Sequence, residues 1–466
     1  MPASKSPKAP KVSYCCTECG WSSPKWMGQC RECREWGTLE ETQVSDSPGG
    51  GAGGALGAAG AVRPTVAARP IGEVSATEAR ARPTGVGELD RVLGGGIVPG
   101  AVVLLAGEPG VGKSTLLLDV AAKAAAVARE RGDGPVLYVT GEESASQVRL
   151  RAERIDALDP GLLLAAETEL GALLGHVEAA GPSLLVVDSV QTIASAQVEG
   201  SAGGVTQVRA VAGALIAVAK ERNIPVLLVG HVTKDGGIAG PRVLEHLVDV
   251  VTQFEGDRHA RLRLLRAVKN RYGPTDEVGC FDLGERGIVG LADPSGLFLS
   301  AARSEVPGTC ATVTLEGRRP MPVEIQALVA PTNAGSPRRT TSGVDHSRTA
   351  MALAVLSARL RVDTSSADVY VSTVGGARAV EPATDLAVAI SVPTPAGLVA
   401  FGEVGLTGEV RATVGIQRRL AEASRLGFDR AIVPLAGSAE LREVAGMQVL
   451  PVAHVGEAMG AALPRG

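Results

Sequence analysis

The stretch GEPGVGKST, residues 107–115, decides the fold of this 466-residue chain. It follows the apolar run AVVLLAG (101–107) and leads into STLLLDVAAKAAAVARER (114–131), which has the composition of a helix. The spacing fits the phosphate-binding loop G-x-x-x-x-G-K-[ST], which requires a strand before it and a helix after it. Backbone N–H groups of such a loop wrap a phosphate at the helix N-terminus. The sequence therefore predicts a nucleotide site formed by Gly107, Glu108, Pro109, Gly110, Val111, Gly112, Lys113, Ser114 and Thr115.

The chemistry of this loop assigns roles to individual side chains. We expect Lys113 to reach the β- and γ-phosphate oxygens and Ser114 to bind Mg²⁺. A second apolar strand, SLLVVDS (183–189), ends in Asp188, which is the expected partner for Mg²⁺. The sequence has no N-K-x-D motif of the kind that selects guanine. We therefore expect ATP with Mg²⁺ as the cofactor.

The general base that positions the attacking water is predicted to follow a different strand. The residue after Asp188 is Ser189 rather than an acid, which disfavours the ring ATPases that carry the base there. The run LYVTGEES (137–144) places Glu142 and Glu143 after the next strand along the chain, and we favour Glu142. The alternative is that the pair only stabilises a helix N-terminus.

Apolar and helical segments alternate over 71–295, which predicts an α/β domain with a mostly parallel sheet. The runs at 261–273 and 277–289 have no helix between them and are predicted as antiparallel strands at one edge. A separate α+β domain is expected over 296–466, with a loop at 335–346.

The N-terminus contains five of the seven cysteines. Two C-x₂-C pairs, separated by ten residues, predict a closed tetrahedral zinc site with the ligands Cys16, Cys19, Cys30 and Cys33. Cys15 is an alternative to Cys16. The sequence therefore predicts a disordered tail over 1–14, a zinc finger over 15–37 and a Gly/Ala/Pro-rich flexible linker over 38–70.

Two glycine-containing loops follow strand ends. GHVTKDGGIAGPRVLEH (230–246) begins with His231, which is either a sensor of the γ-phosphate or a structural histidine. Lys234 and Arg242 on this loop are candidates for contacts with nucleic-acid phosphates. The second loop is 191–209, with Arg209 at its end.

Composition limits how the chain can meet nucleic acid or membranes. The formal net charge is −4 and aromatic residues are 3%, so any binding of nucleic acid must come from local loops or a channel, rather than from a basic surface or a stacking platform. We find no apolar run as long as a membrane span and no secretory signal at the start. The expected location is the cytoplasm, without membrane contact.

These motifs, in this order, resemble the bacterial RadA (Sms) DNA-repair family. The similarity lies in CTECGWSSPKWMGQCREC (16–33), the P-loop, GHVTKDGGIAGPRVLEH, KNRYG (269–273) and DVYVSTVGGARAVEPATDLAVAI (368–390). It implies a RecA-like core, a homohexameric ring, ATP hydrolysis stimulated by single-stranded DNA, and branch migration of branched DNA alongside the RecA recombinase. One departure is Tyr272, where the family motif has Phe.

The resemblance also implies a C-terminal domain similar to the proteolytic domain of Lon, which uses a Ser-Lys dyad. Here Ala383 stands at the position of the serine and Gln417 at that of the lysine. No lysine follows Lys269 in the chain, so the dyad is chemically unavailable. This disfavours an ATP-dependent protease. An ATPase that acts only on protein partners remains as the alternative to a DNA motor.

The run AVKNRYGPT (267–275) carries two cations, Lys269 and Arg271, at alternate positions of a predicted edge strand. In a ring, the edge strands of one subunit face the nucleotide of the next. We predict that both cations reach the γ-phosphate of the neighbouring subunit, as an arginine finger does. Direct contact with DNA, or a merely solvated strand edge, is the alternative.

Overall fold

The computed structural model describes residues 12–16, 22–23, 25–31, 36–43, 70–73, 80–231, 242–256, 261–300, 306–333, 335–392 and 398–462. The chain divides into two compact units, Met1–Val74 and Ser75–Gly466. The first contains a three-stranded antiparallel sheet in the order β2-β1-β3. Its strands are β1 (Val12–Cys16), β2 (Ser22–Ser23) and β3 (Leu39–Gln43).

The second unit begins with a nine-stranded sheet in the order β12-β11-β10-β9-β4-β8-β7-β5-β6. The six strands from β9 to β6 are parallel, and β10, β11 and β12 extend the sheet with antiparallel pairs. This confirms the predicted parallel sheet with an antiparallel edge. The strands are β4 (Val102–Gly107), β5 (Val136–Thr140), β6 (Leu162–Ala166), β7 (Leu184–Asp188), β8 (Val226–His231), β9 (Val250–Glu255), β10 (Leu262–Asn270), β11 (Val278–Gly284) and β12 (Gly287–Gly290).

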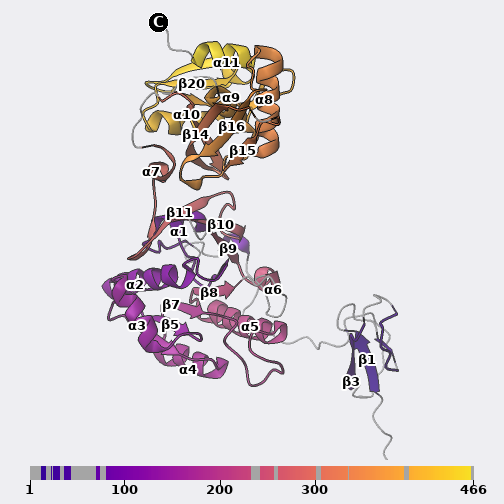
Figure 1. The fold of residues 1–466 in the computed structure, drawn as a ribbon. Coiled ribbons are helices and arrows are strands. Elements are labelled where there is room, and N and C mark those ends of the chain that lie inside the picture. The colour runs from indigo at the N-terminus through magenta and orange to yellow at the C-terminus, as the bar shows by residue number, and fades with distance from the viewer. Residues whose placement is uncertain are drawn as a thin grey trace, which may run out of the picture. The chain divides into compact units, whose positions relative to one another are not determined.

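Helices cover both faces of this sheet, shown in violet to magenta in Figure 1. On β4, Val103 and Leu105 pack in the cluster that contains α1, α2 and α3, whereas Val102 and Leu104 pack with α4 and α5. This alternation is the period of two that a strand buried on both faces requires. The helices are α1 (Gly87–Leu93), α2 (Lys113–Arg131), α3 (Ala145–Arg154), α4 (Leu170–Ala180), α5 (Val205–Arg222) and α6 (Arg242–Glu245).

Three local differences from the sequence analysis have physical reasons. The unit β6–α4 was not predicted, because the strand is a short LLLAA run without β-branched residues at the half-exposed sheet edge. The loop predicted over 335–346 contains β15 (Arg339–Ser342), whose polar RTTS sequence pairs with β16. The loop predicted over 191–209 ends at Gly204, so Arg209 lies on helix α5.

The C-terminal part has a seven-stranded mixed sheet in the order β15-β16-β14-β13-β17-β20-β21. The predicted strand pair β13–β14 and the helices α8 and α10 are present. Besides β15, the strands of this sheet are β13 (Thr309–Glu316), β14 (Arg319–Pro331), β16 (Ala367–Thr373), β17 (Val399–Ala400), β20 (Arg430–Pro434) and β21 (Gln448–Val452). A separate pair is formed by β18 (Glu403–Val404) and β19 (Val410–Arg411). The helices are α7 (Ser295–Phe298), α8 (His346–Leu360), α9 (Asp385–Ser391), α10 (Ile416–Arg425) and α11 (Val455–Ala462).

A buried ion pair joins β14 to helix α1 within the second unit. Arg319 contacts Glu88, and both side chains are almost fully buried. The guanidinium also donates to the carbonyl oxygens of Val278 (3.1 Å), Leu291 (2.9 Å) and Ala292 (2.9 Å). These bonds offset the desolvation of the two charges. The nine-stranded and seven-stranded sheets therefore contact each other near residues 295 and 296, where we predicted a domain boundary. That boundary stays a prediction.

Among the described helices, none is both long enough and apolar enough to cross a membrane.

Candidate active site

The P-loop connects the end of β4 to the start of α2 and depends on glycine at two positions. Gly107 ends the strand, and a Cβ there would lie 2.5 Å from the carbonyl oxygen of Phe254 on β9. Gly112 precedes the helix with φ of 108°, a conformation that favours glycine. The loop therefore closes tightly over the strand and leads the first N–H groups of α2 toward a single point, as phosphate binding requires.

Lys113 lies inside this loop. Its Nζ donates to the carbonyl oxygens of Gly107 at 2.8 Å and Glu108 at 2.9 Å. Burial lowers the pKa of Lys113 to about 8, against the opposing charges of Asp188 and Glu142. The ammonium group therefore bonds back to the loop that it closes, beside two carboxylates.

Asp188 ends β7 and has one oxygen suited to a hydrated cation. The Tyr138 hydroxyl donates to Oδ2 at 2.6 Å. Burial and the Asp188 charge raise the pKa of Tyr138 well above its usual range, so the hydroxyl stays a donor. Oδ1 is buried and has no hydrogen-bond partner in the described part of the chain. A buried carboxylate oxygen normally needs a partner, and water held by Mg²⁺ would supply one. Ser114 on the first turn of α2 and Asp188 thus fit the predicted metal.

The two candidate bases point to different partners. Both follow β5, whose last residue Thr140 pairs with Asp188 in the sheet. Glu142 accepts a hydrogen bond from the Ser189 hydroxyl at 2.5 Å, next to Asp188. Glu143 accepts from Arg151 on helix α3. Glu142 thus lies beside Asp188, whereas Glu143 is paired with Arg151 of helix α3.

The predicted loop residues are only partly described. His231 ends β8 directly beside Gly107 in the sheet, but its side chain, like that of Arg242, is outside the description, and so is Lys234 entirely. Arg209 is exposed on α5. The buried Gln207 fastens the preceding loop by donating to the carbonyl oxygens of Ser195 (3.1 Å), Val198 (2.5 Å) and Gly200 (3.2 Å).

Lys269 and Arg271 lie at the opposite end of the sheet from their own P-loop. The prediction that both stand on an edge strand is wrong, because β10 lies between β9 and β11 and ends at Asn270, so Arg271 follows the strand. Lys269 Nζ donates to the carbonyl oxygens of Glu245 and Val248, both at 2.8 Å. Arg271 Nη1 lies 3.3 Å from Oδ1 of Asp249, which precedes β9. Asp249 accepts a hydrogen bond from Val102, the first residue of β4, whereas the P-loop begins at the other end of this strand, at Gly107. At about 3.3 Å per residue, roughly 17 Å separate the two ends, so neither cation reaches its own nucleotide.

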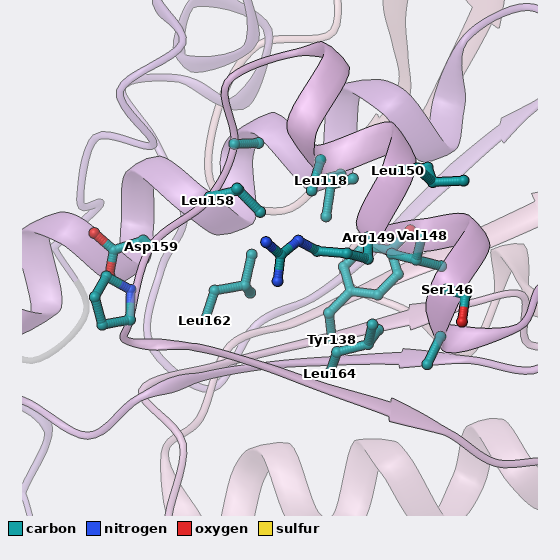
Figure 2. A pocket seen from close by; sticks show the side chains of 14 residues that line it. Leu118, Tyr138, Ser146, Val148, Arg149, Leu150, Leu158, Asp159, Leu162 and Leu164 are labelled. Atoms are coloured by element: carbon teal, nitrogen blue, oxygen red, sulfur yellow. The ribbon is translucent and has the colours of Figure 1, made fainter.

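Two cavities lie in this region of the sheet. One of about 250 Å³ is lined by Gly107, Glu108 and Val111 of the P-loop and by Gln253 and Phe254 of β9. The other, about 930 Å³, lies between α3, β6 and the loop that joins them (Figure 2). Its lining is mainly leucine, alanine and valine side chains, with Arg149 and Asp159 as its charged members. An apolar groove does not suit a triphosphate, so the first cavity belongs to the nucleotide site.

The C-terminal part contains no Ser-Lys dyad at the positions that the resemblance indicates. Ala383 is buried beside β17 and β18, and its carbonyl oxygen accepts from the backbone N–H of Gly402 at 2.9 Å. Gln417 bonds through its side-chain amide to the backbone of Arg442. Neither side chain is a nucleophile or a base.

The described residues of the N-terminal unit include two of the four predicted zinc ligands. Cys16 on β1 and Cys30 are both buried in one small cluster with Leu39. Cys19 and Cys33 fall outside the described residues, and no group of three or more ligating side chains occurs within the described ones. Two buried thiols in one small core suit a soft cation such as Zn²⁺.

We expect Cys30→Ser to release zinc and loosen the N-terminal unit, because a closed zinc site needs all four ligands. ATP hydrolysis by the full chain should persist, since the P-loop lies in the other unit. Zinc content per chain measures the first effect and phosphate release the second. Cys15→Ser is the matched control and should retain zinc. Full zinc occupancy in Cys30→Ser would contradict this ligand set.

Sequence reasoning missed three residues of this region. Tyr138 stands within an apolar strand and Asp249 at the entry to another, and neither belongs to a recognisable motif. Lys220 ends a helix like many surface lysines, yet it bonds to Asp249. For Asp249, the one signal in the sequence was a carboxylate directly before an apolar strand.

Comparisons with known proteins agree with this geometry. Residues 68–237 match a family model described as an AAA domain, and residues 14–41 match a rubredoxin metal binding domain. The DNA repair protein RadA of Mycolicibacterium smegmatis is 52% identical, over 91% of both chains. RadA of Pseudomonas aeruginosa is 46% identical over 97% of this chain and 98% of the relative. RadA of Bacillus subtilis is 42% identical over 97% of this chain and 99% of the relative.

These similarities cover the zinc-ribbon unit, the P-loop core and the C-terminal sheet together. The P-loop, the parallel sheet with its antiparallel edge and the N-terminal ribbon agree with a RecA-like ATPase fold. The chain therefore belongs to the RadA family of DNA repair proteins.

Proposed function

We propose that this RadA-family ATPase is a DNA-dependent motor that processes recombination intermediates. In this role it promotes branch migration during strand exchange by the RecA recombinase and the repair of DNA breaks, in the cytoplasm. The observation that carries the ATPase part is the buried Lys113 within 3 Å of the loop carbonyls, beside Oδ1 of Asp188, which has no partner among the described residues. The names of the relatives and the resemblance of the motifs support the DNA part.

Each side chain of the site has a proposed task. Lys113 leaves the loop carbonyls for the β- and γ-phosphate oxygens, and the loop N–H groups hold the β-phosphate. Ser114 and Asp188 would hold Mg²⁺, which would supply positive charge to neutralise the phosphates. Glu142 orients the attacking water, supported by its position beside Asp188 and by the engagement of Glu143 with Arg151. His231 senses the γ-phosphate from the end of β8.

Assembly and DNA binding complete the proposal. We place the chain in a homohexameric ring, where Lys269 and Arg271 serve the neighbouring nucleotide. Their position at the end of the sheet opposite their own P-loop supports this arrangement. Single-stranded and branched DNA pass through the ring near Lys234, Arg242 and Arg209. The C-terminal part acts without peptide cleavage, because Ala383 and Gln417 replace the dyad.

ATP turnover with and without single-stranded DNA tests this function against the protein-only alternative. A DNA motor should hydrolyse ATP severalfold faster with DNA, and the stimulation should weaken as salt rises because phosphate contacts release counterions. Branch migration of a labelled three-stranded intermediate with RecA is the second readout. Turnover that ignores DNA at low salt, in assembled protein, would favour an ATPase that acts only on proteins.

A further inference from the structure

We propose that Asp249 is a positioning residue that orients Arg271 toward the next subunit. This inference rests on the proposed trans role of Arg271 and adds to it the carboxylate that holds the guanidinium. Asp249 is not part of any nucleotide-binding motif, and it lies at the end of the sheet that is remote from its own P-loop.

The Asp249 carboxylate is buried, with 5% of its side chain exposed, and its two oxygens have different partners. Oδ2 accepts from the backbone N–H of Val102 at 3.0 Å and from Lys220 Nζ at 2.6 Å. Oδ1 accepts from Arg271 Nη1 at 3.3 Å. The Val102 bond fixes the carboxylate to the central strand β4, so the carboxylate is a rigid anchor for a flexible arginine.

Arg271 itself is held on one side and open on the other. Its side chain is 56% exposed, and within the described part of the chain it donates a single hydrogen bond, from Nη1. A guanidinium has five N–H donors in a planar fork. One anchored nitrogen restricts the orientation of the group while the other donors remain available to a phosphate. Such orientation lowers the entropy cost of a transition-state contact.

Lys220 shares the charge of this carboxylate, so Arg271 can keep Nη1 on Oδ1 while its other donors face a phosphate. A buried carboxylate needs its charge compensated, and an arginine that was its sole counterion would be held more fully by the two oxygens and would have fewer donors left for a phosphate. Lys220 bonds to the other oxygen of Asp249 and keeps it paired. Lys220 also lies 3.5 Å from the hydroxyl of Tyr272, the residue that replaces the family's Phe next to Arg271. This lysine thus ties the Tyr272 ring to the same anchor.

The first test is Asp249→Asn, which keeps the shape and an acceptor for Val102 but removes the charge that holds Arg271. We expect kcat for ATP to fall about tenfold, with an unchanged KM, an intact ring and little change in melting temperature. Asp282→Asn is the matched control, because Asp282 on β11 forms a solvent-accessible ion pair with Arg261 and its loss should leave kcat unchanged. If Asp249→Asn does not fold, Asp249→Glu keeps the charge but displaces it, and should also lower kcat.

Mixing variant subunits in one ring separates loss of Arg271 positioning from damage to the P-loop. If Asp249 acts through Arg271, mixing its variant with Lys113→Ala subunits regains turnover, whereas mixing it with Arg271→Ala subunits does not. If the substitution instead distorts β4 and its P-loop, the pattern reverses and the inference is overturned.

Single and double variants separate this inference from the proposed function. In the Arg271→Ala background, Asp249→Asn should add no further loss of kcat, since the two residues act as one unit. A severe Arg271→Ala defect together with normal turnover in Asp249→Asn overturns the positioning role alone. Normal turnover in Arg271→Ala would mean that the trans role itself has failed.

Discussion

Lys113→Ala is expected to reduce ATP turnover by about 10²-fold or more. The substitution removes a preorganised positive charge from the place where negative charge develops on the phosphate in the transition state. In the structure this ammonium group is buried and bonds to the carbonyl oxygens of Gly107 and Glu108. Alanine therefore leaves those carbonyls without the donor that closes the loop. We expect the variant to fold, because the ammonium is buried at a cost that lowers its pKa to about 8, and alanine removes that cost.

Phosphate release at saturating ATP, with single-stranded DNA present, measures this effect. Lys123→Ala is a suitable control, because Lys123 lies on the same helix and forms an exposed ion pair with Asp119. Both variants should show native circular dichroism and the same oligomeric state. If Lys113→Ala turns over ATP at a near-normal rate, the P-loop assignment is wrong.

Those parts of the fold that depend on local sequence were predictable. The P-loop needs glycine at fixed positions between a strand and a helix, and this local requirement placed β4 and α2 correctly. The antiparallel edge followed from the absence of a helix between β10 and β11. Strand β6 was missed because its identity as a strand comes from pairing with β5, not from its own leucines and alanines.

The candidate site shows the same limit. The choice between Glu142 and Glu143 depends on Ser189 and Arg151, which lie on different elements. The network at Asp249 joins residues 102, 220, 249 and 271, which no local pattern connects. Sequence alone names the residue types that phosphate chemistry requires, whereas tertiary contacts decide which of two neighbouring carboxylates lies beside Asp188.

The cation pair of the KNRYG motif is expected to show the second large effect. Arg271→Ala should still bind ATP and form rings but hydrolyse ATP poorly, since an arginine finger contributes up to about 10³–10⁵ in rate in other NTPases. Lys269→Ala should also be impaired. Part of its effect would be structural, because Lys269 donates to the carbonyl oxygen of Glu245, which ends α6, and to that of Val248. Arg271 is therefore the cleaner probe.

Mixing Arg271→Ala with Lys113→Ala subunits decides whether the finger acts in trans. One variant retains an intact P-loop and the other an intact finger, so in a head-to-tail ring about one quarter of the interfaces in an equal mixture combine both. Turnover should rise above that of either variant alone once subunits have exchanged, which a fluorescence energy-transfer assay can verify. If exchange occurs and turnover does not recover, Arg271 does not act on the neighbouring nucleotide. Direct DNA contact would then take its place, and the Arg271 variant should show weaker DNA binding with a shallower salt dependence, because a phosphate contact has been lost.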